Sequence, residues 1–271
     1  MTKLAVLGSP IGHSQSPALH RAAYRELGLD WTYDAIETAP DALPGFVETR
    51  GTDWRGLSLT MPLKRTVLPL LSEIDLFSEL TGGANTLLFD GSHRRGFNTD
   101  VVGLVESFRA AGVAELSSVR ILGGGATAAS ALVAASRLGA SRVVIAVRAP
   151  ERIGTLVSLG EQLGVALSVD TLGASGDGNV DAVVSTLPNG SAHLEPPVAG
   201  AVLFDVAYEP WPTALAHAWT AAGCTVIPGI ELLTRQALAQ VRIFVSGSVD
   251  TPLADEARVF AAMRAAVGLA A

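Results

Sequence analysis

Of the 19 lysines and arginines in this chain of 271 residues, only Lys3 and Lys64 are lysines. Arginine keeps its proton near neutral pH, whereas a buried lysine can give one up. Lys3 lies at a chain end that we expect to be frayed, where the identity of a basic residue matters little. Lys64 is therefore the candidate for proton transfer.

Further polar side chains fall near the ends of strands expected in the first hundred residues. They are Ser14, Ser16, Ser58, Thr60, Asn85, Asn98, Thr99 and Asp100. Ligands of open α/β sheets bind outside the carboxyl ends of the strands, so these groups could converge on one crevice. Their hydroxyls and amides suit a small polyhydroxylated anion, and Lys64 with Asp100 would form an acid–base pair. Taken singly, Ser16, Thr99 and Asp100 could instead be helix caps, and Asn85 could hold a turn.

A second candidate site is the stretch 119–128, where a mostly apolar run ends in three glycines and an alanine-rich helical segment follows. The pattern fits G-x-G-x-x-A, with Gly123 for the tight turn, Gly125 for close backbone approach and Ala128 for helix packing. Glycine amides and a helix N-terminus attract a pyrophosphate, although such turns also join plain βα units. The predicted cofactor-binding residues here are Gly123, Gly124, Gly125, Ala126, Thr127 and Ala128.

The residues after the next expected strand, 143–147, bear on the choice of nucleotide. A site for NAD usually has an acidic residue about 20 positions after the glycines, for the ribose 2′-hydroxyl. Arg148 stands at this place, with Arg152 close behind. Arginine forms paired hydrogen bonds with phosphate, so NADP(H) is the predicted cofactor. The alternative is two solvent-facing arginines on a loop.

Composition limits the class of protein. No apolar run approaches the roughly 18 residues of a membrane span, so no membrane partner is expected. The net charge of −7 comes without a basic stripe, which argues against nucleic acid. The single cysteine, Cys224, excludes an internal disulfide and fits a cytoplasmic location. Five scattered histidines and no C-x-x-C pattern argue against a metal site.

The periodicity of apolar residues predicts an α/β fold in two parts. Strands are expected at 4–7, 31–36, 56–59, 87–89, 94–98, 119–122, 143–147, 181–186, 202–205 and 225–227. Helices are expected at 17–28, 44–49, 65–71, 100–111, 126–138, 151–163, 212–222, 232–245 and 256–267. Strands that alternate with helices predict a doubly wound parallel sheet of Rossmann type in the second part, after an N-terminal α/β domain.

The order of the motifs along the chain resembles that of the shikimate dehydrogenase family. The motifs are GSPIGHSQSP at 8–17, TMPLK at 60–64, ANTL at 84–87, NTD at 98–100, the glycine turn, DVAYEP at 205–210 and GIELLTRQ at 229–236. The resemblance implies NADPH-dependent, reversible reduction of 3-dehydroshikimate to shikimate in aromatic amino acid (chorismate) biosynthesis. It also implies a substrate-binding domain of residues 1–100 with 237–271, and a dinucleotide-binding domain of residues 101–236. We expect a monomer or a homodimer.

By the same resemblance, Lys64 and Asp100 are the catalytic pair, and Ser14 and Ser16 hold the substrate carboxylate. The substrate site would be completed by Thr60, Asn85, Tyr208 and Gln236. Gly229 would lie near the nicotinamide through its backbone.

Four positions depart from the family pattern. The family commonly has Asn at Ser58, Gly at Ala126, Asn at Val147 and Asn at Ser185. Ser58 could weaken one hydrogen bond on the substrate side. With Val147 and Ala149 beside Arg148, the phosphate site could depend on Arg152 or Thr127 instead.

Two other functions remain open at this stage. An NAD-dependent quinate/shikimate dehydrogenase would be expected to have an acid in place of Arg148. A non-catalytic NADP sensor would need the glycine turn but would have no use for a Lys64–Asp100 pair.

Overall fold

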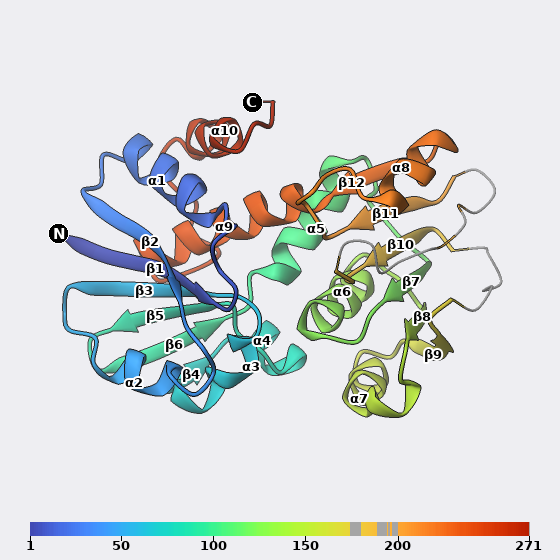
Figure 1. Cartoon of the computed structure of the whole chain (residues 1–271), viewed down its shortest axis with the longest axis horizontal. Helices are drawn as coiled ribbons and strands as arrows, with labels where there is room; N and C mark the ends of the chain where they lie inside the picture. The colour runs from blue at the N-terminus through green and yellow to red at the C-terminus, as the bar shows by residue number, and fades with distance from the viewer. Residues whose placement is uncertain (174–179, 189–193, 195, 197–199, 271) are drawn as a thin grey trace. The chain divides into compact units, whose positions relative to one another are not determined.

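The structure, a computed structural model, describes residues 1–173, 180–188, 194, 196 and 200–270. The chain divides into two compact units (Figure 1). Unit 1 comprises Met1–Asp100 and Thr234–Ala271, and unit 2 comprises Val101–Leu233. Each unit contains a six-stranded sheet with helices, which confirms the predicted α/β fold class. Within the described ranges, none of the helices combines the length and apolarity that a membrane span requires.

Unit 1 is built on a mixed sheet. Its strands are β1 (Thr2–Gly8), β2 (Trp31–Glu37), β3 (Trp54–Leu59), β4 (Glu73–Ile74), β5 (Thr86–Asp90) and β6 (His93–Phe97). Their order is β2-β1-β3-β5-β6-β4. Strands β2, β1 and β3 are parallel, so the loops that follow them leave the same edge of the sheet. Strands β5 and β6 form the expected antiparallel hairpin.

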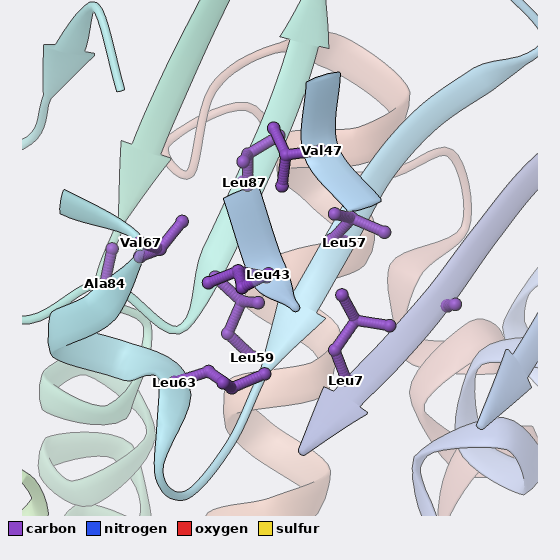
Figure 2. Packing of buried hydrophobic residues seen from close by; sticks show 10 residues of the cluster. Leu7, Leu43, Val47, Leu57, Leu59, Leu63, Val67, Ala84 and Leu87 are labelled. Atoms are coloured by element: carbon purple, nitrogen blue, oxygen red, sulfur yellow. The ribbon is translucent and has the colours of Figure 1, made fainter. Parts of the chain in front are cut away.

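The two faces of this sheet are covered by different segments. The helical segments of unit 1 are α1 (Ser16–Glu26), α2 (Leu43–Glu48), α3 (Leu63–Thr66), the 3-10 turn η1 (Leu68–Leu70), α4 (Leu76–Thr81), the later part of α9 (Gly229–Ser246) and α10 (Glu256–Ala266). Figure 2 shows Leu43 and Val47 of α2 packed with Leu57 and Leu59 of β3 in one buried cluster.

Side chains alternate between the faces of a strand, so positions 56 and 58 of β3 face the side of the sheet opposite to Leu57 and Leu59. There, a Cβ added to Gly56 would lie 2.4 Å from the ring of Phe244 in α9. Helix α9 therefore packs directly against β3.

Unit 2 has the doubly wound parallel sheet that the sequence predicts. Its strands are β7 (Ser118–Leu122), β8 (Arg142–Val147), β9 (Ala166–Thr171), β10 (Ala182–Ser185), β11 (Val202–Asp205) and β12 (Thr225–Pro228). They are parallel in the order β12-β11-β10-β7-β8-β9, so the strand order reverses between β7 and β10. The helical segments are α5 (Asp100–Ala110), α6 (Ala126–Arg137), the 3-10 turn η2 (Pro150–Arg152), α7 (Gly154–Gln162) and α8 (Ala214–Ala221). A ligand site is expected where the order reverses.

Several local predictions were wrong or missing. The helix predicted from residue 151 begins at Gly154, because residues 150–152 form η2. Strand β9 was not predicted, since its residues are partly exposed along their length and give no apolar run. Strand β4 and helix α4 were also not predicted, and they contain only 2 and 6 residues.

Candidate active site

Lys64 and Asp100 form an ion pair inside unit 1. Lys64 lies in α3, just after β3, and Asp100 is the first residue of α5. Lys64 Nζ is 2.6 Å from Asp100 Oδ2, and the two side chains are 15% and 6% exposed. A charge-assisted hydrogen bond is strong when both partners are largely shielded from solvent, as they are here.

Asn85 holds the second oxygen of this carboxylate. Its Nδ2 donates to Asp100 Oδ1 at 2.8 Å and to Thr99 Oγ1 at 2.9 Å. The backbone N–H of Asp100 donates to Asn98 Oδ1 at 3.0 Å. The alternative of Asp100 as a helix cap is therefore wrong, because Asn98 bonds to the helix start while the Asp100 carboxylate binds Lys64 and Asn85.

Gln236 joins the same cluster from α9. Its Oε1 is 3.3 Å from Asn85 Nδ2 and 3.4 Å from Thr99 Oγ1, and the residue is buried. The structure thus brings together four of the predicted site residues, which lie far apart in sequence: Lys64, Asn85, Asp100 and Gln236.

The loops after β1 and β3 carry the remaining candidates of unit 1. Thr60 follows β3, and a Cβ added to Gly8 would lie 2.4 Å from the Thr60 methyl carbon, so the two loops approach closely here. Ser14 Oγ accepts from the Ser16 backbone N–H at 3.3 Å. Ser16 does not cap α1, because it is already helical and its position leaves the cap to Gln15. Among the described residues, no hydrogen bond joins either serine to the Lys64–Asp100 pair.

The glycine turn of unit 2 leads from β7 into α6 at the reversal of strand order. Gly123 has a φ of +111°, which favours glycine, and an added Cβ would lie 2.4 Å from Thr186 Oγ1. Thr186 follows β10 and donates to Leu122 O at 2.8 Å. Both φ and the close approach of Thr186 therefore require glycine at position 123.

The start of α6 fits an anion. Gly124 and Gly125 are exposed, Ala126 and Thr127 are partly exposed, and Ala128 is buried. A Cβ added at Gly125 would meet nothing within 4 Å, so the space beside this turn is open. The first N–H groups of a helix have no partner within it, and the helix dipole favours negative charge there.

Arg148 and Arg152 both lie on the surface of unit 2. Arg148 directly follows β8, the neighbour of β7, and is exposed. Arg152 lies in η2, where its side chain is 84% exposed and its Nε is 3.9 Å from Glu151. No acid stands at the end of β8, so this donor set suits a phosphate rather than a hydroxyl.

Tyr208 and Gly229 lie in neighbouring segments of unit 2. Tyr208 follows β11, and burial, with the nearby Glu209 charge, raises its pKa above the usual value. A Cβ on Gly229 would lie 2.0 Å from Val206 O, so only glycine fits there. In the part of the chain that the structure describes, no group of three or more His, Cys, Asp or Glu residues could hold a metal ion.

Comparison with known proteins decides the family. Residues 6–87 match the model of the shikimate dehydrogenase substrate binding domain. The shikimate dehydrogenase (NADP(+)) of Methanothermobacter thermautotrophicus is 33% identical over 261 residues, which cover 92% of each chain. The chain belongs to the shikimate dehydrogenase family.

Solved structures of the family agree with this assignment. The shikimate dehydrogenase of Mycobacterium tuberculosis is 37% identical and superposes with a TM-score of 0.88, covering 98% of this chain and 100% of that one. The Thermus thermophilus enzyme, solved in complex with NADP(H) and shikimate, is 29% identical with a TM-score of 0.83, again over 98% and 100% of the two chains.

One of the departures from the family pattern, Ser58, has a clear structural setting. Its hydroxyl is buried, accepts from Tyr33 Oη at 2.6 Å and donates to Gln240 Oε1 at 2.8 Å. Gln240 was not among the predicted residues. The available signal was its spacing, because it lies one helical turn after Gln236 on a largely apolar helix.

Proposed function

We propose that this chain catalyses the NADPH-dependent, reversible reduction of 3-dehydroshikimate to shikimate in aromatic amino acid biosynthesis. The observation that carries the proposal is the partly buried Lys64–Asp100 pair, 2.6 Å apart, in a chain that belongs to this family. A non-catalytic NADP sensor would have no use for such a pair.

The proposed substrate-binding and dinucleotide-binding residues are divided between the two units. Unit 1 contains the catalytic pair and all the residues proposed for the substrate except Tyr208, and unit 2 contains those proposed for the dinucleotide. The domain boundary expected from the resemblance, 236/237, would place Gln236 with the dinucleotide. Compact unit 1 includes Thr234–Ala271, and within it Gln236 lies within hydrogen-bond distance of Asn85. This division supports Gln236 as a substrate-binding residue.

Lys64 is the proton donor in the direction of reduction. NADPH, when bound, supplies the hydride. As the ketone is reduced, negative charge grows on its oxygen, and a nearby ammonium both stabilises that charge and donates a proton. Asp100 orients the ammonium through the 2.6 Å hydrogen bond, and Asn85 fixes the carboxylate from its other side.

The other assignments follow the family pattern. Ser14 and Ser16 bind the substrate carboxylate, while Thr60, Asn85 and Tyr208 bind other polar groups of the substrate. Gly229 contributes its backbone beside the nicotinamide. The residues assigned to the rest of the nucleotide are Gly123, Gly124, Gly125, Ala126, Thr127, Ala128, Arg148 and Arg152.

The test is nicotinamide absorbance with shikimate or quinate against NADP or NAD. Lys64→Ala should lower kcat by about 10²–10⁴-fold, as is usual for the loss of a general acid, with an unchanged Kd for NADPH. Lys3→Ala is the matched control, since Lys3 is the other lysine and pairs with Asp53 at 2.8 Å on the surface. Nearly full turnover in Lys64→Ala would show that Lys64 is not the proton donor and has only a structural role. Turnover of quinate with NAD alone would favour the quinate/shikimate alternative.

The enzyme works in the cytoplasm, where its single cysteine, Cys224, stays reduced. It acts as a monomer or a homodimer. Light scattering after gel filtration distinguishes the two, and a larger assembly would contradict the proposal.

A further inference from the structure

A row of buried polar side chains leads to the Lys64–Asp100 pair in unit 1, and the proposed function uses only one of them, Asn85. It runs from α1 to α9 and then to the start of β5. Its members are Tyr24, His20, Gln240, Thr86 and Asn85, with a side branch through Ser58 and Tyr33. All seven are buried. Buried polar groups are costly unless they are paired, so the direction of each hydrogen bond matters.

Backbone groups fix the direction of both amides in the row. Gln240 Nε2 is 3.1 Å from Asn85 O, a carbonyl that can only accept. Asn85 Oδ1 is 3.0 Å from the Thr99 backbone N–H, which can only donate. The NH₂ of Gln240 therefore faces Asn85 and Thr86, and the NH₂ of Asn85 faces Asp100.

The orientation of Gln240 in turn fixes the tautomer of His20. Gln240 Oε1 can only accept, so His20 Nε2, at 3.2 Å, carries the proton. His20 Nδ1 then accepts from Tyr24 Oη at 3.1 Å. Burial lowers the pKa of His20 to about 3, so the ring is neutral at physiological pH, as this arrangement requires.

The hydrogen bonds consequently point in one direction. Tyr24 donates to His20, which donates to Gln240, and Gln240 donates to Thr86 and to Asn85 O. Thr86 Oγ1 donates to Asn85 Oδ1 at 2.8 Å. Asn85 then donates to Asp100 Oδ1 at 2.8 Å. The series ends on the carboxylate that orients Lys64.

We propose that Gln240, itself held by His20, is a positioning residue for the Lys64–Asp100 pair, because it locks Asn85 with its NH₂ toward Asp100. The inference rests on the proposed function of that pair. Gln240 acts through Asn85 and Thr86, so its removal should affect the chemical step more than cofactor binding. A misplacement of about 1 Å at a reacting group can cost about 10²-fold in rate.

The test compares Gln240→Met with Val241→Ala. Methionine keeps the length of glutamine but can neither donate nor accept these bonds, and Val241 is a fully buried neighbour on α9 outside the row. We expect Gln240→Met to lower kcat by about 10–100-fold, with the KM for NADP within about twofold of wild type. Val241→Ala should keep kcat, although it loses thermal stability. Equal kcat values for the two variants would overturn the inference.

A second variant tests whether His20 acts through Gln240. His20→Phe keeps a ring stacked on Tyr33, 4.0 Å away between centroids, but removes the donor to Gln240. We expect a smaller loss of kcat, and no further loss when the change is added to Gln240→Met, because both act along one path. Additive losses would contradict that path. If Gln240→Met does not fold, a wild-type kcat in His20→Phe overturns the inference.

The outcome for Lys64→Ala separates this inference from the function on which it rests. An inactive Lys64→Ala together with a fully active Gln240→Met would remove only the role of Gln240. An active Lys64→Ala would remove the proposed catalytic pair itself.

Discussion

Acidification should destabilise unit 1 through a single histidine. His20 is completely buried, with its ring stacked on Tyr33 and its two nitrogens bonded to Tyr24 and Gln240. Burial also raises the pKa of both tyrosines, so neither of them supplies a negative charge that would offset a proton on the ring. The perturbation is a change from about pH 7.5 to about pH 4.5, which protonates His20 readily only when the chain is unfolded.

The magnitude follows from the two pKa values of His20. Its pKa falls from the ordinary 6.5 to about 3 in the folded protein. Well above pH 6.5 the ring is neutral in both states, and the full stability is present. Below that, the unfolded state binds more protons, so the free energy of unfolding falls by about 1.4 kcal/mol per pH unit until the folded pKa is reached. At about pH 4.5, two units below the ordinary value, the loss is about 2.7 kcal/mol.

Native-state hydrogen exchange of peptides from α1 measures this loss in unit 1 alone. His20→Gln removes the titrating group, so its loss between the two pH values should be smaller than that of wild type by about 2.7 kcal/mol. Any stability that the substitution costs at neutral pH cancels in this difference. His13→Gln, which changes an exposed histidine, should behave as wild type. Equal losses in wild type and His20→Gln would refute the reasoning.

Three further outcomes are expected. Arg148→Ala should weaken NADPH binding by about 10–100-fold in a fluorescence titration and leave NADH unchanged, and an unaffected NADPH constant would move the phosphate contact elsewhere. Gly229→Ala should cost about 1–3 kcal/mol in chemical denaturation, since its Cβ would meet Val206 O at 2.0 Å; an unchanged midpoint would show that the backbone yields freely. Shikimate should be oxidised with a kcat/KM at least about tenfold above that of quinate, whose extra hydroxyl would press on the carboxylate end at Ser14 and Ser16. Comparable values for the two acids would show that this end of the site is roomy.

The sequence predicted best what short-range patterns determine. Continuous apolar runs identified β8 and β11, and the glycines at 123–125 marked the turn into α6. Strand β9 was not predicted, because an edge strand with exposed residues has no such apolar run. Helix α4 was not predicted because it is only 6 residues long. It does have a capping residue, Asp75, which accepts from the Ser78 N–H at 2.8 Å.

The site shows the same limit. Lys64 was singled out by residue type. Its pairing with Asp100 was expected from the convergence of strand ends and from the family resemblance, since no local rule links residues that far apart. A helix cap was the alternative for Ser16, because it stands just before the helix expected at 17–28, yet the helix already includes it. Gln240 was missed because its partner Asn85 lies 155 residues away, and only the packing of α9 on β3 brings them together.

The division of unit 1 between two stretches of chain has a consequence for biosynthesis. Residues 1–100 leave the ribosome first and carry the six strands of that unit, but the face of β3 at Gly56 and Ser58 is covered by Phe244 and Gln240. Unit 2 is one continuous stretch, so it can fold before Phe244 and Gln240 have been synthesised and can pack on the sheet of unit 1. A nascent chain therefore leaves this face of β3 uncovered throughout the synthesis of unit 2. The helices made last complete the sheet that was made first.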